Sequence, residues 1–214
     1  MRDREVMTPE CVADMESGIF SGFLPPIENC RFGGSQQRIL VWGDSFAEHY
    51  SPLLGRLGKK QGIGLTHRLL GGCPPILGVV PMRAGAPHDD CAEFNSLVEK
   101  ELAGLRSMGI DSVILSANWL MQSPGSDDVA IQSPDGIVAR FADGLSRTLA
   151  VLDSQGFKVL LIAPSVAFPI DVPICLGRRS AELCGISRSV FEAHRQKIFA
   201  TMQAAAAGKP KQFR

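Results

Sequence analysis

The chain of 214 residues is long enough for one domain with a sizeable core and leaves little room for a second. Its 45% hydrophobic and 21% charged residues are typical of a globular protein, which excludes extensive disorder. Because 22 basic residues balance 22 acidic ones, the net charge gives no electrostatic argument for nucleic acid or an anionic membrane as a partner.

Neither a membrane-spanning helix nor a secretory signal is evident. The most apolar stretch, residues 159–174, is interrupted by Pro164, Pro169 and Asp171, so it falls short of the roughly 18 apolar residues that cross a membrane. Residues 1–5 are mostly charged and lead into no apolar region typical of a signal peptide.

The first part of the chain predicts little regular structure. Residues 1–37 contain pairs of prolines and glycines without a helical or strand period, so we expect an irregular linker or strap. Four apolar residues then follow, 39–42, and predict a short buried strand. We therefore divide the chain into this strap, an α/β domain over residues 38–207, and a tail over residues 208–214.

The residues directly after this strand are the most typical of an active site. Gly43 allows a sharp change of direction, and Asp44 and Ser45 lie where a helix is expected to begin. A serine hydroxyl at a helix N-terminus lies beside unpaired N–H groups that stabilise a developing oxyanion, so Ser45 is a candidate nucleophile. Asp44 is expected to cap the helix and hold the turn. The alternative is that Asp44 or Ser45 is an N-cap and nothing more.

Helical and strand patterns alternate along the rest of the domain. Helices are predicted over residues 46–60, 91–108, 136–155 and 187–207. Further strands are predicted over 62–70, 112–116 and 157–163, and the last of these is expected to be fully apolar. Loops are expected between these elements, including residues 164–185. Strands that alternate with helices predict βαβ units and a parallel sheet covered on both faces. The expected fold is a three-layer α/β/α sandwich.

Ser45, Gly72 and Asn118 each follow the end of a predicted strand. Ligands of parallel sheets bind outside the carboxyl ends of the strands, so one cleft is expected to collect the three residues. Gly72, or alternatively Gly71, offers a backbone N–H that no side chain blocks, and Asn118 offers a side-chain N–H. The alternatives are a plain turn at the glycines and a strand-end cap at Asn118. Trp119 is expected to be a core or cleft-wall residue.

The six cysteines predict an oxidising compartment. We expect neighbours in sequence to pair: Cys11 with Cys30, Cys73 with Cys91, and Cys175 with Cys184. Each pair encloses a loop containing proline or glycine, where a cross-link stabilises the fold by about 3 kcal/mol. Other pairings and free thiols stay open on the sequence alone. No C-x-x-C motif is present and no histidine has metal-ligand spacing from a cysteine, which argues against a zinc site, and no other metal or cofactor is indicated.

These motifs resemble the SGNH (GDSL-like) esterases and acyltransferases, whose nucleophile block G-D-S-[FH] follows a buried strand. The finer resemblance is to the SGNH domain fused behind membrane acyltransferase-3 bundles, and it covers about residues 11–207. The shared features are V-W-G-D-S-F at 41–46, C-P-P-I-L-G at 73–78, a strand ending at Trp119, and Pro173-Ile174-Cys175 with Cys184.

The resemblance implies an enzyme domain that forms an acyl-enzyme on Ser45 and acts on acyl esters, acetyl above all, of bacterial cell-surface carbohydrate. The oxyanion donors would be the N–H of Ser45, the N–H of Gly72 and the side chain of Asn118, with Asp44 and Trp119 in support. It further implies a carbohydrate acceptor, an acyl donor and an upstream membrane acyltransferase domain as partners, no cofactor, and a periplasmic or other extracytoplasmic location.

The sequence departs from the family at the general base. The family's D-x-x-H motif near the C-terminus is absent, since Phe46, Gly64, Gly85 and Phe191 stand three residues before His49, His67, His88 and His194. His49 follows Ser45 by one helical turn but is expected to point along the helix. We therefore expect a chain truncated before the last strand of the sheet, a piece of a longer exported or membrane-anchored protein. Without its base, such a site keeps a small residual of the full rate.

Two other functions are considered. A non-catalytic remnant that binds glycan or a partner through the same cleft is favoured by the missing base. A flavodoxin-like domain that binds a small ligand is disfavoured, because G-D-S-F is not the glycine-rich phosphate loop G-x-G-x-x-G.

Overall fold

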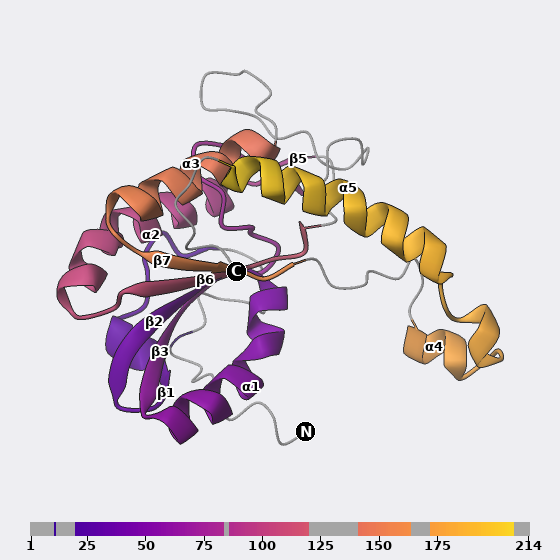
Figure 1. The fold of residues 1–214 in the computed structure, drawn as a ribbon, viewed down its shortest axis with the longest axis horizontal. Coiled ribbons are helices and arrows are strands. Elements are labelled where there is room, and N and C mark those ends of the chain that lie inside the picture. The colour runs from indigo at the N-terminus through magenta and orange to yellow at the C-terminus, as the bar shows by residue number, and fades with distance from the viewer. Residues whose placement is uncertain (1–10, 12–19, 84–85, 120–140, 164–171, 208–214) are drawn as a thin grey trace.

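The computed structural model describes residues 11, 20–83, 86–119, 141–163 and 172–207 (Figure 1). Its central feature is a five-stranded sheet of order β1-β3-β2-β6-β7. The strands are β1 (Arg31–Gly33), β2 (Gln36–Gly43), β3 (Ile63–Leu69), β6 (Ser112–Ser116) and β7 (Lys158–Leu161). All neighbours pair in parallel except β1, which runs antiparallel to β3. The predicted α/β fold with a largely parallel sheet is confirmed.

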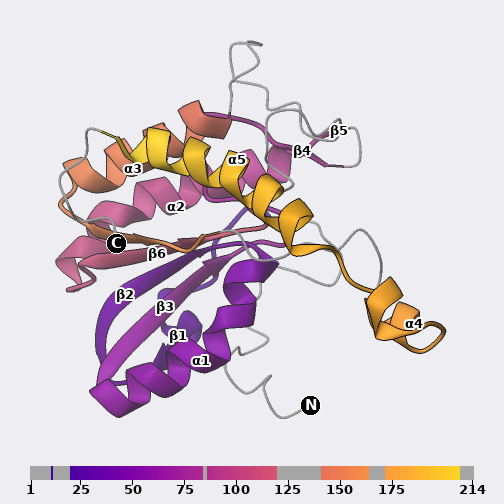
Figure 2. The same ribbon diagram turned by 45° about the vertical axis from the view of Figure 1, so that its right-hand side comes forward.

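Helices cover both faces of this sheet (Figures 1 and 2). The helices are α1 (Ser45–Gln61), α2 (Asp89–Ser107), α3 (Phe141–Ser154), α4 (Val172–Leu176) and α5 (Arg188–Ala206), and short 3-10 helices span Ile27–Cys30 and Ala181–Leu183. Helix α1 lies on one face, while α2 and α3 lie on the other and α5 packs along α3. A small antiparallel pair, β4 (Met82–Arg83) and β5 (Ala86–Pro87), precedes α2.

Alternation along β2 divides the buried apolar residues into two clusters. Leu40 and Trp42 belong to the larger cluster, which is completed by residues of α2, α3 and α5, and Val41 belongs to the smaller cluster with Ala47 of α1. Successive side chains of a strand point to opposite faces, so one short strand supplies both clusters. The result is the expected three-layer sandwich.

The structure contains regular elements in segments that the sequence predicts to be irregular or loops. The strap predicted as irregular contains the 3-10 helix, β1, and the first residues of β2, which begins at Gln36. The predicted loop over 164–185 contains α4 and the 3-10 helix Ala181–Leu183. These elements are too short to show a period, and β1 exists because it pairs with the edge of β3. The division into strap, domain and tail stays a prediction.

Strand β7 is shorter and more exposed than the apolar stretch 157–163 suggests. It has one neighbour, β6, in the part of the chain that the structure describes, and Lys158 and Leu160 are exposed. An edge strand of a sheet needs apolar residues on its covered face alone, which explains why Val159 is buried and Leu160 is not.

All six cysteines form disulfides in the predicted pairs, Cys11–Cys30, Cys73–Cys91 and Cys175–Cys184. They tie residue 11 to the 3-10 helix Ile27–Cys30, the loop after β3 to α2, and α4 to the residue after the 3-10 helix Ala181–Leu183. Among the helices described, none is long and apolar enough to cross a membrane. Three disulfides fit folding in an extracytoplasmic, oxidising compartment.

A buried histidine lies between α1 and the sheet. His67 on β3 is fully buried, its ring stacks on Phe32 at 3.9 Å between centroids, and its Nε2 lies 2.8 Å from the Oγ of Ser51. Burial lowers the pKa of His67 from its ordinary 6.5 to about 3. The imidazole is therefore neutral at every pH at which the protein is expected to work.

We predict that His67 makes folding sensitive to acid. Because the folded protein keeps His67 neutral to about pH 3, the unfolded state binds the extra proton as the pH falls below 6.5. Stability contributed by neutral His67 is present above pH 6.5 and is lost below it, at up to about 1.4 kcal/mol per pH unit. Urea unfolding at pH 7 and pH 5 measures this loss.

The variant His67→Phe removes the titrating group and is expected to lose less stability than the unchanged protein between these two pH values. The matched control is His49→Phe, because His49 is exposed. This variant should lose as much stability between pH 7 and pH 5 as the unchanged protein does. Equal losses in the unchanged protein and His67→Phe would contradict the assignment.

Candidate active site

The ends of three neighbouring strands meet at one edge of the sheet. Gly43 at the end of β2 pairs with Leu69 of β3 on one side and with Ser116 of β6 on the other. The segments that follow these strands contain Ser45, Gly72 and Asn118, so the structure places all three candidate residues along the same edge. Their order along the edge is that of β3, β2 and β6.

Gly43 is required by the close approach of β2 to β6. A Cβ atom at this position would lie 1.8 Å from the backbone oxygen of Ser116, which no side chain can do. The backbone then connects both neighbours: Asp44 N donates to Ser116 O at 3.4 Å, and Leu70 N donates to Gly43 O at 3.1 Å. The turn that carries Ser45 is therefore fixed on both sides.

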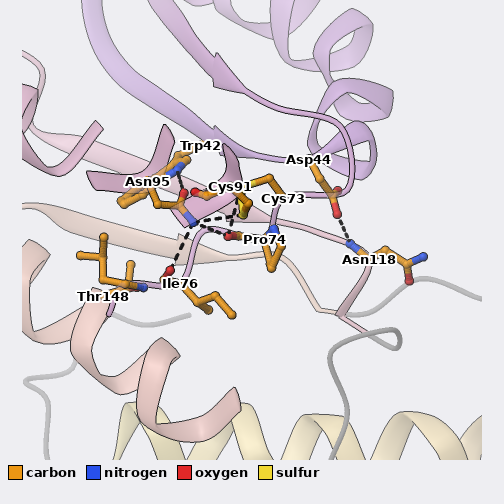
Figure 3. Close-up of a disulfide and its surroundings, with 10 residues drawn as sticks. Trp42, Asp44, Cys73, Pro74, Ile76, Cys91, Asn95, Asn118 and Thr148 are labelled. Carbon is orange, nitrogen blue, oxygen red and sulfur yellow. Dashed lines mark hydrogen bonds between the residues drawn. A yellow bond between two sulfur atoms is a disulfide. The ribbon is translucent and has the colours of Figure 1, made fainter. Parts of the chain in front are cut away.

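Asp44 joins the start of α1 to the segment after β6. It is buried and is the N-cap of α1: its Oδ1 accepts a hydrogen bond from Phe46 N at 2.8 Å, and its Oδ2 accepts one from Asn118 N at 2.9 Å (Figure 3). Burial raises the pKa of Asp44 above its ordinary value, against the lowering effect of the hydrogen bonds from Asn118 and Phe46. The cap is a sequence expectation, whereas the bond to Asn118 is a contact that no local pattern indicates.

Ser45 is the first residue of α1 and is half-buried. Within the described part of the chain, no side chain hydrogen bonds to its Oγ. His49 is exposed on α1 with its ring 5.6 Å from that of Phe46, and His67 contacts Ser51 instead. His88 is buried at the start of α2, and the side chain of His194 lies outside the described structure. The structure therefore brings no described histidine into hydrogen bonding with Ser45.

Gly72 lies in an exposed position of the loop after β3 and has a φ of 68°, a left-handed conformation that favours glycine. The residue after it, Cys73, is buried and joined to Cys91 of α2. The loop is thus covalently fixed one residue beyond the candidate N–H donor.

Asn95 of α2 holds the same loop from inside the core. Its Nδ2 donates to Pro74 O at 2.8 Å and to Ile76 O at 3.2 Å, and its Oδ1 accepts from Trp42 Nε1 at 3.0 Å (Figure 3). The sequence analysis missed Asn95. The available signal was a polar residue four positions after Cys91, on the apolar face of a predicted helix.

Asn118 and Trp119 follow β6 with different surroundings. Asn118 is half-buried, and its side-chain amide points away from the Asp44 carboxylate that binds its backbone (Figure 3). Trp119 is buried, donates from Nε1 to Ile162 O at 2.8 Å and lies 5.7 Å from the ring of Phe141. Trp119 therefore packs in the core.

The comparison with protein families agrees with the α/β fold. The family model described as SGNH domain (fused to AT3 domains) matches residues 10–214. The chain belongs to this SGNH family. No curated protein matches the chain. Membership supports a hydrolase- or acyltransferase-like domain, and the family description supports a membrane acyltransferase domain joined to the SGNH domain in relatives.

We predict that Asp44 orders two separate segments of the SGNH domain. Asp44→Ala removes the acceptor of two backbone N–H groups, so it should cost about 2 kcal/mol of stability and accelerate hydrogen exchange at both Phe46 and Asn118. Asp44→Asn keeps one carbonyl oxygen, so one of the two amides should stay protected. Unchanged exchange at Asn118 in Asp44→Ala would show that the carboxylate does not hold this segment.

A second prediction concerns the loop that carries Gly72 in the SGNH domain. Asn95→Ala leaves the indole N–H of Trp42 and two backbone oxygens without their partner, so we expect a loss of about 3 kcal/mol or more in urea unfolding. Thr148→Val is the comparison, because the Thr148 hydroxyl accepts one hydrogen bond from Leu77 N at 2.9 Å and donates one to Gly144 O at 3.1 Å, within its own helix. It should cost less than Asn95→Ala, and the reverse order would contradict the role given to Asn95.

Proposed function

We propose that this SGNH domain forms an acyl-enzyme on Ser45 and transfers an acyl group, acetyl above all, between a donor and a hydroxyl of bacterial cell-surface carbohydrate. One observation carries the proposal: a single buried carboxylate, Asp44, binds both the helix that begins at Ser45 and the backbone of Asn118. This contact supports a fixed relation between the proposed nucleophile and a proposed oxyanion donor.

The chemistry proceeds in two steps. The Oγ of Ser45 attacks the acyl carbonyl carbon and loses its proton to a base, and the carbonyl oxygen becomes an oxyanion held by the N–H of Ser45, the N–H of Gly72 and the side chain of Asn118. Collapse of this intermediate breaks the bond to the donor, whose alcohol or thiol leaves with a proton. The acceptor hydroxyl, or water, then attacks the acyl-enzyme and regenerates Ser45.

The general base is the point at which this chain differs from the SGNH motif pattern. The sequence contains no D-x-x-H motif, and no described histidine hydrogen bonds to Ser45. The oxyanion donors still favour attack on an activated ester, whereas the second step needs a base to activate the acceptor. We therefore propose that the 214-residue chain is acylated by activated esters and releases the acyl group slowly.

The setting proposed for this reaction is the periplasm. Three disulfides require an oxidising compartment, and the family description names fusion to AT3 domains. We propose that a membrane acyltransferase domain supplies the acyl group and that the SGNH domain passes it to the carbohydrate acceptor.

A second candidate function is non-catalytic binding of the glycan at the same edge of the sheet. The missing D-x-x-H motif favours it. Glycan binding that is retained in Ser45→Ala, together with no acylation of the unchanged protein, would support this function over the first.

We predict that Ser45 becomes acetylated by p-nitrophenyl acetate. Mass spectrometry of the intact protein should show the gain of one acetyl group, and peptide mapping should place it on Ser45, because acylation by a good leaving group depends least on the missing base. Added imidazole, an external base, should accelerate loss of the acetyl group.

The variants Ser45→Ala and Ser154→Ala complete this experiment. Ser154 is an exposed serine at the end of α3, so its replacement should leave acetylation unchanged, whereas Ser45→Ala should abolish it. Acetylation that persists in Ser45→Ala, or is absent from the folded unchanged protein, would exclude Ser45 as the nucleophile.

A further inference from the structure

Residues 172–190, here called the stapled arm, extend away from the sandwich. The arm comprises α4, the 3-10 helix Ala181–Leu183 and the first residues of α5. In both ribbon views α4 lies at the far end of α5, well separated from the sheet (Figures 1 and 2). Nearly every residue of the arm is exposed or half-exposed, and Cys184 is the buried exception.

The arm presents large apolar side chains to water. The exposed fractions are 54% for Ile174, 50% for Leu176, 65% for Leu183 and 47% for Val190. Single exposed apolar residues are common on protein surfaces, but several on one small segment are typical of a surface that binds something. The two described core clusters contain none of these four residues.

A disulfide and backbone hydrogen bonds within the arm stabilise the conformation in which these side chains are exposed. The Cys175–Cys184 disulfide closes the arm. Within it, Arg179 N donates to Cys175 O at 2.8 Å, and Leu183 N donates to Ser180 O at 3.1 Å. The arm is thus a small structure that its own bonds fix, and its apolar side chains are exposed in the described structure.

The charge of the arm differs from that of the whole chain. Residues 172–190 contain Arg178, Arg179 and Arg188 against one acidic residue, Glu182, while the complete sequence is neutral. Arg188 forms a salt bridge with Glu192 on α5 at 2.7 Å, so the excess positive charge of the arm comes from Arg178 and Arg179. Arg178 and Arg179 are exposed and lie between the apolar residues of α4 and Leu183. Apolar side chains interspersed with arginines are the composition that binds the surface of an anionic bilayer, where each basic residue adds attraction to lipid phosphates.

We propose that the stapled arm docks the SGNH domain onto the surface of a bilayer that contains anionic lipid. Ile174, Leu176 and Leu183 enter the headgroup region, and Arg178 and Arg179 contact the phosphates. The fusion to AT3 domains named in the family description is consistent with a membrane close to this domain. The net charge of the whole sequence does not indicate a membrane-binding site, because acidic residues elsewhere in the chain cancel the excess positive charge of the arm.

Binding to lipid vesicles tests this proposal with the 214-residue protein. Vesicles of phosphatidylcholine alone and of an equal mixture with phosphatidylglycerol are sedimented with the protein at low and high salt. We expect binding to the mixed vesicles that weakens as salt rises, and little binding to phosphatidylcholine alone. Absence of binding to the mixed vesicles at low salt would overturn the proposal.

Variants separate the arm from the rest of the surface. Ile174→Glu with Leu183→Glu, and Arg178→Glu with Arg179→Glu, should each reduce binding about tenfold or more. Leu57→Glu is the matched control, because Leu57 is 50% exposed on α1, a helix outside the arm, and this variant should bind as the unchanged protein does. Thermal unfolding of each variant verifies that the fold is retained.

Two results would count against the bilayer as the occupant. Equal loss of binding in Leu57→Glu would mean that the arm is not the site. A dimer seen by analytical ultracentrifugation and abolished by Ile174→Glu with Leu183→Glu would mean that a second copy covers the arm. Ser45→Ala should bind vesicles normally, so failure of the acylation experiment and failure of this one are distinguishable.

Discussion

The Asp44 carboxylate is the contact on which the arrangement of the candidate site depends. One oxygen caps α1 and the other binds the backbone after β6, so the residue next to Ser45 also determines where Asn118 lies. A buried carboxylate is costly unless it accepts hydrogen bonds, and here two backbone N–H groups supply them. Burial therefore raises the pKa of Asp44, and the two hydrogen bonds lower it. Both N–H groups are needed to offset the cost of burying this carboxylate.

The segment that carries Gly72 is held by different means. The disulfide of Cys73 and the two hydrogen bonds from Asn95 to Pro74 O and Ile76 O fix its far side to α2, while the backbone of Leu70 fixes its near side to Gly43. Two independent sets of contacts thus converge on the ends of three adjacent strands. An oxyanion site needs donors that do not reorganise as charge develops, and such doubly anchored segments meet this requirement.

The sequence predicted the central strands and the long helices because each follows from a local pattern. The disulfide pairs, which the structure confirms, were expected from their neighbouring places in the sequence, which by themselves leave other pairings open. The strand over 112–116 has the predicted bounds, and α5 begins within one residue of the helix predicted over 187–207. The short strand β1, the bond from Asp44 to Asn118 and the role of Asn95 were not predictable in this way. Each depends on a partner far along the chain, and a three-residue strand or a single polar residue carries no period.

In this protein, the contacts that hold the candidate site in place are distinct from the group that would accept the proton of Ser45. In the described residues, the contacts that position Ser45, Gly72 and the backbone of Asn118 come from backbone atoms, Asp44, Asn95 and a disulfide. His67, the most buried of the described histidines, is neutral and holds α1 against β3 through Ser51. A site built in this manner stays organised whether or not a base faces Ser45. Retention of the fold therefore says nothing about the rate of acyl transfer, and the two have to be measured separately.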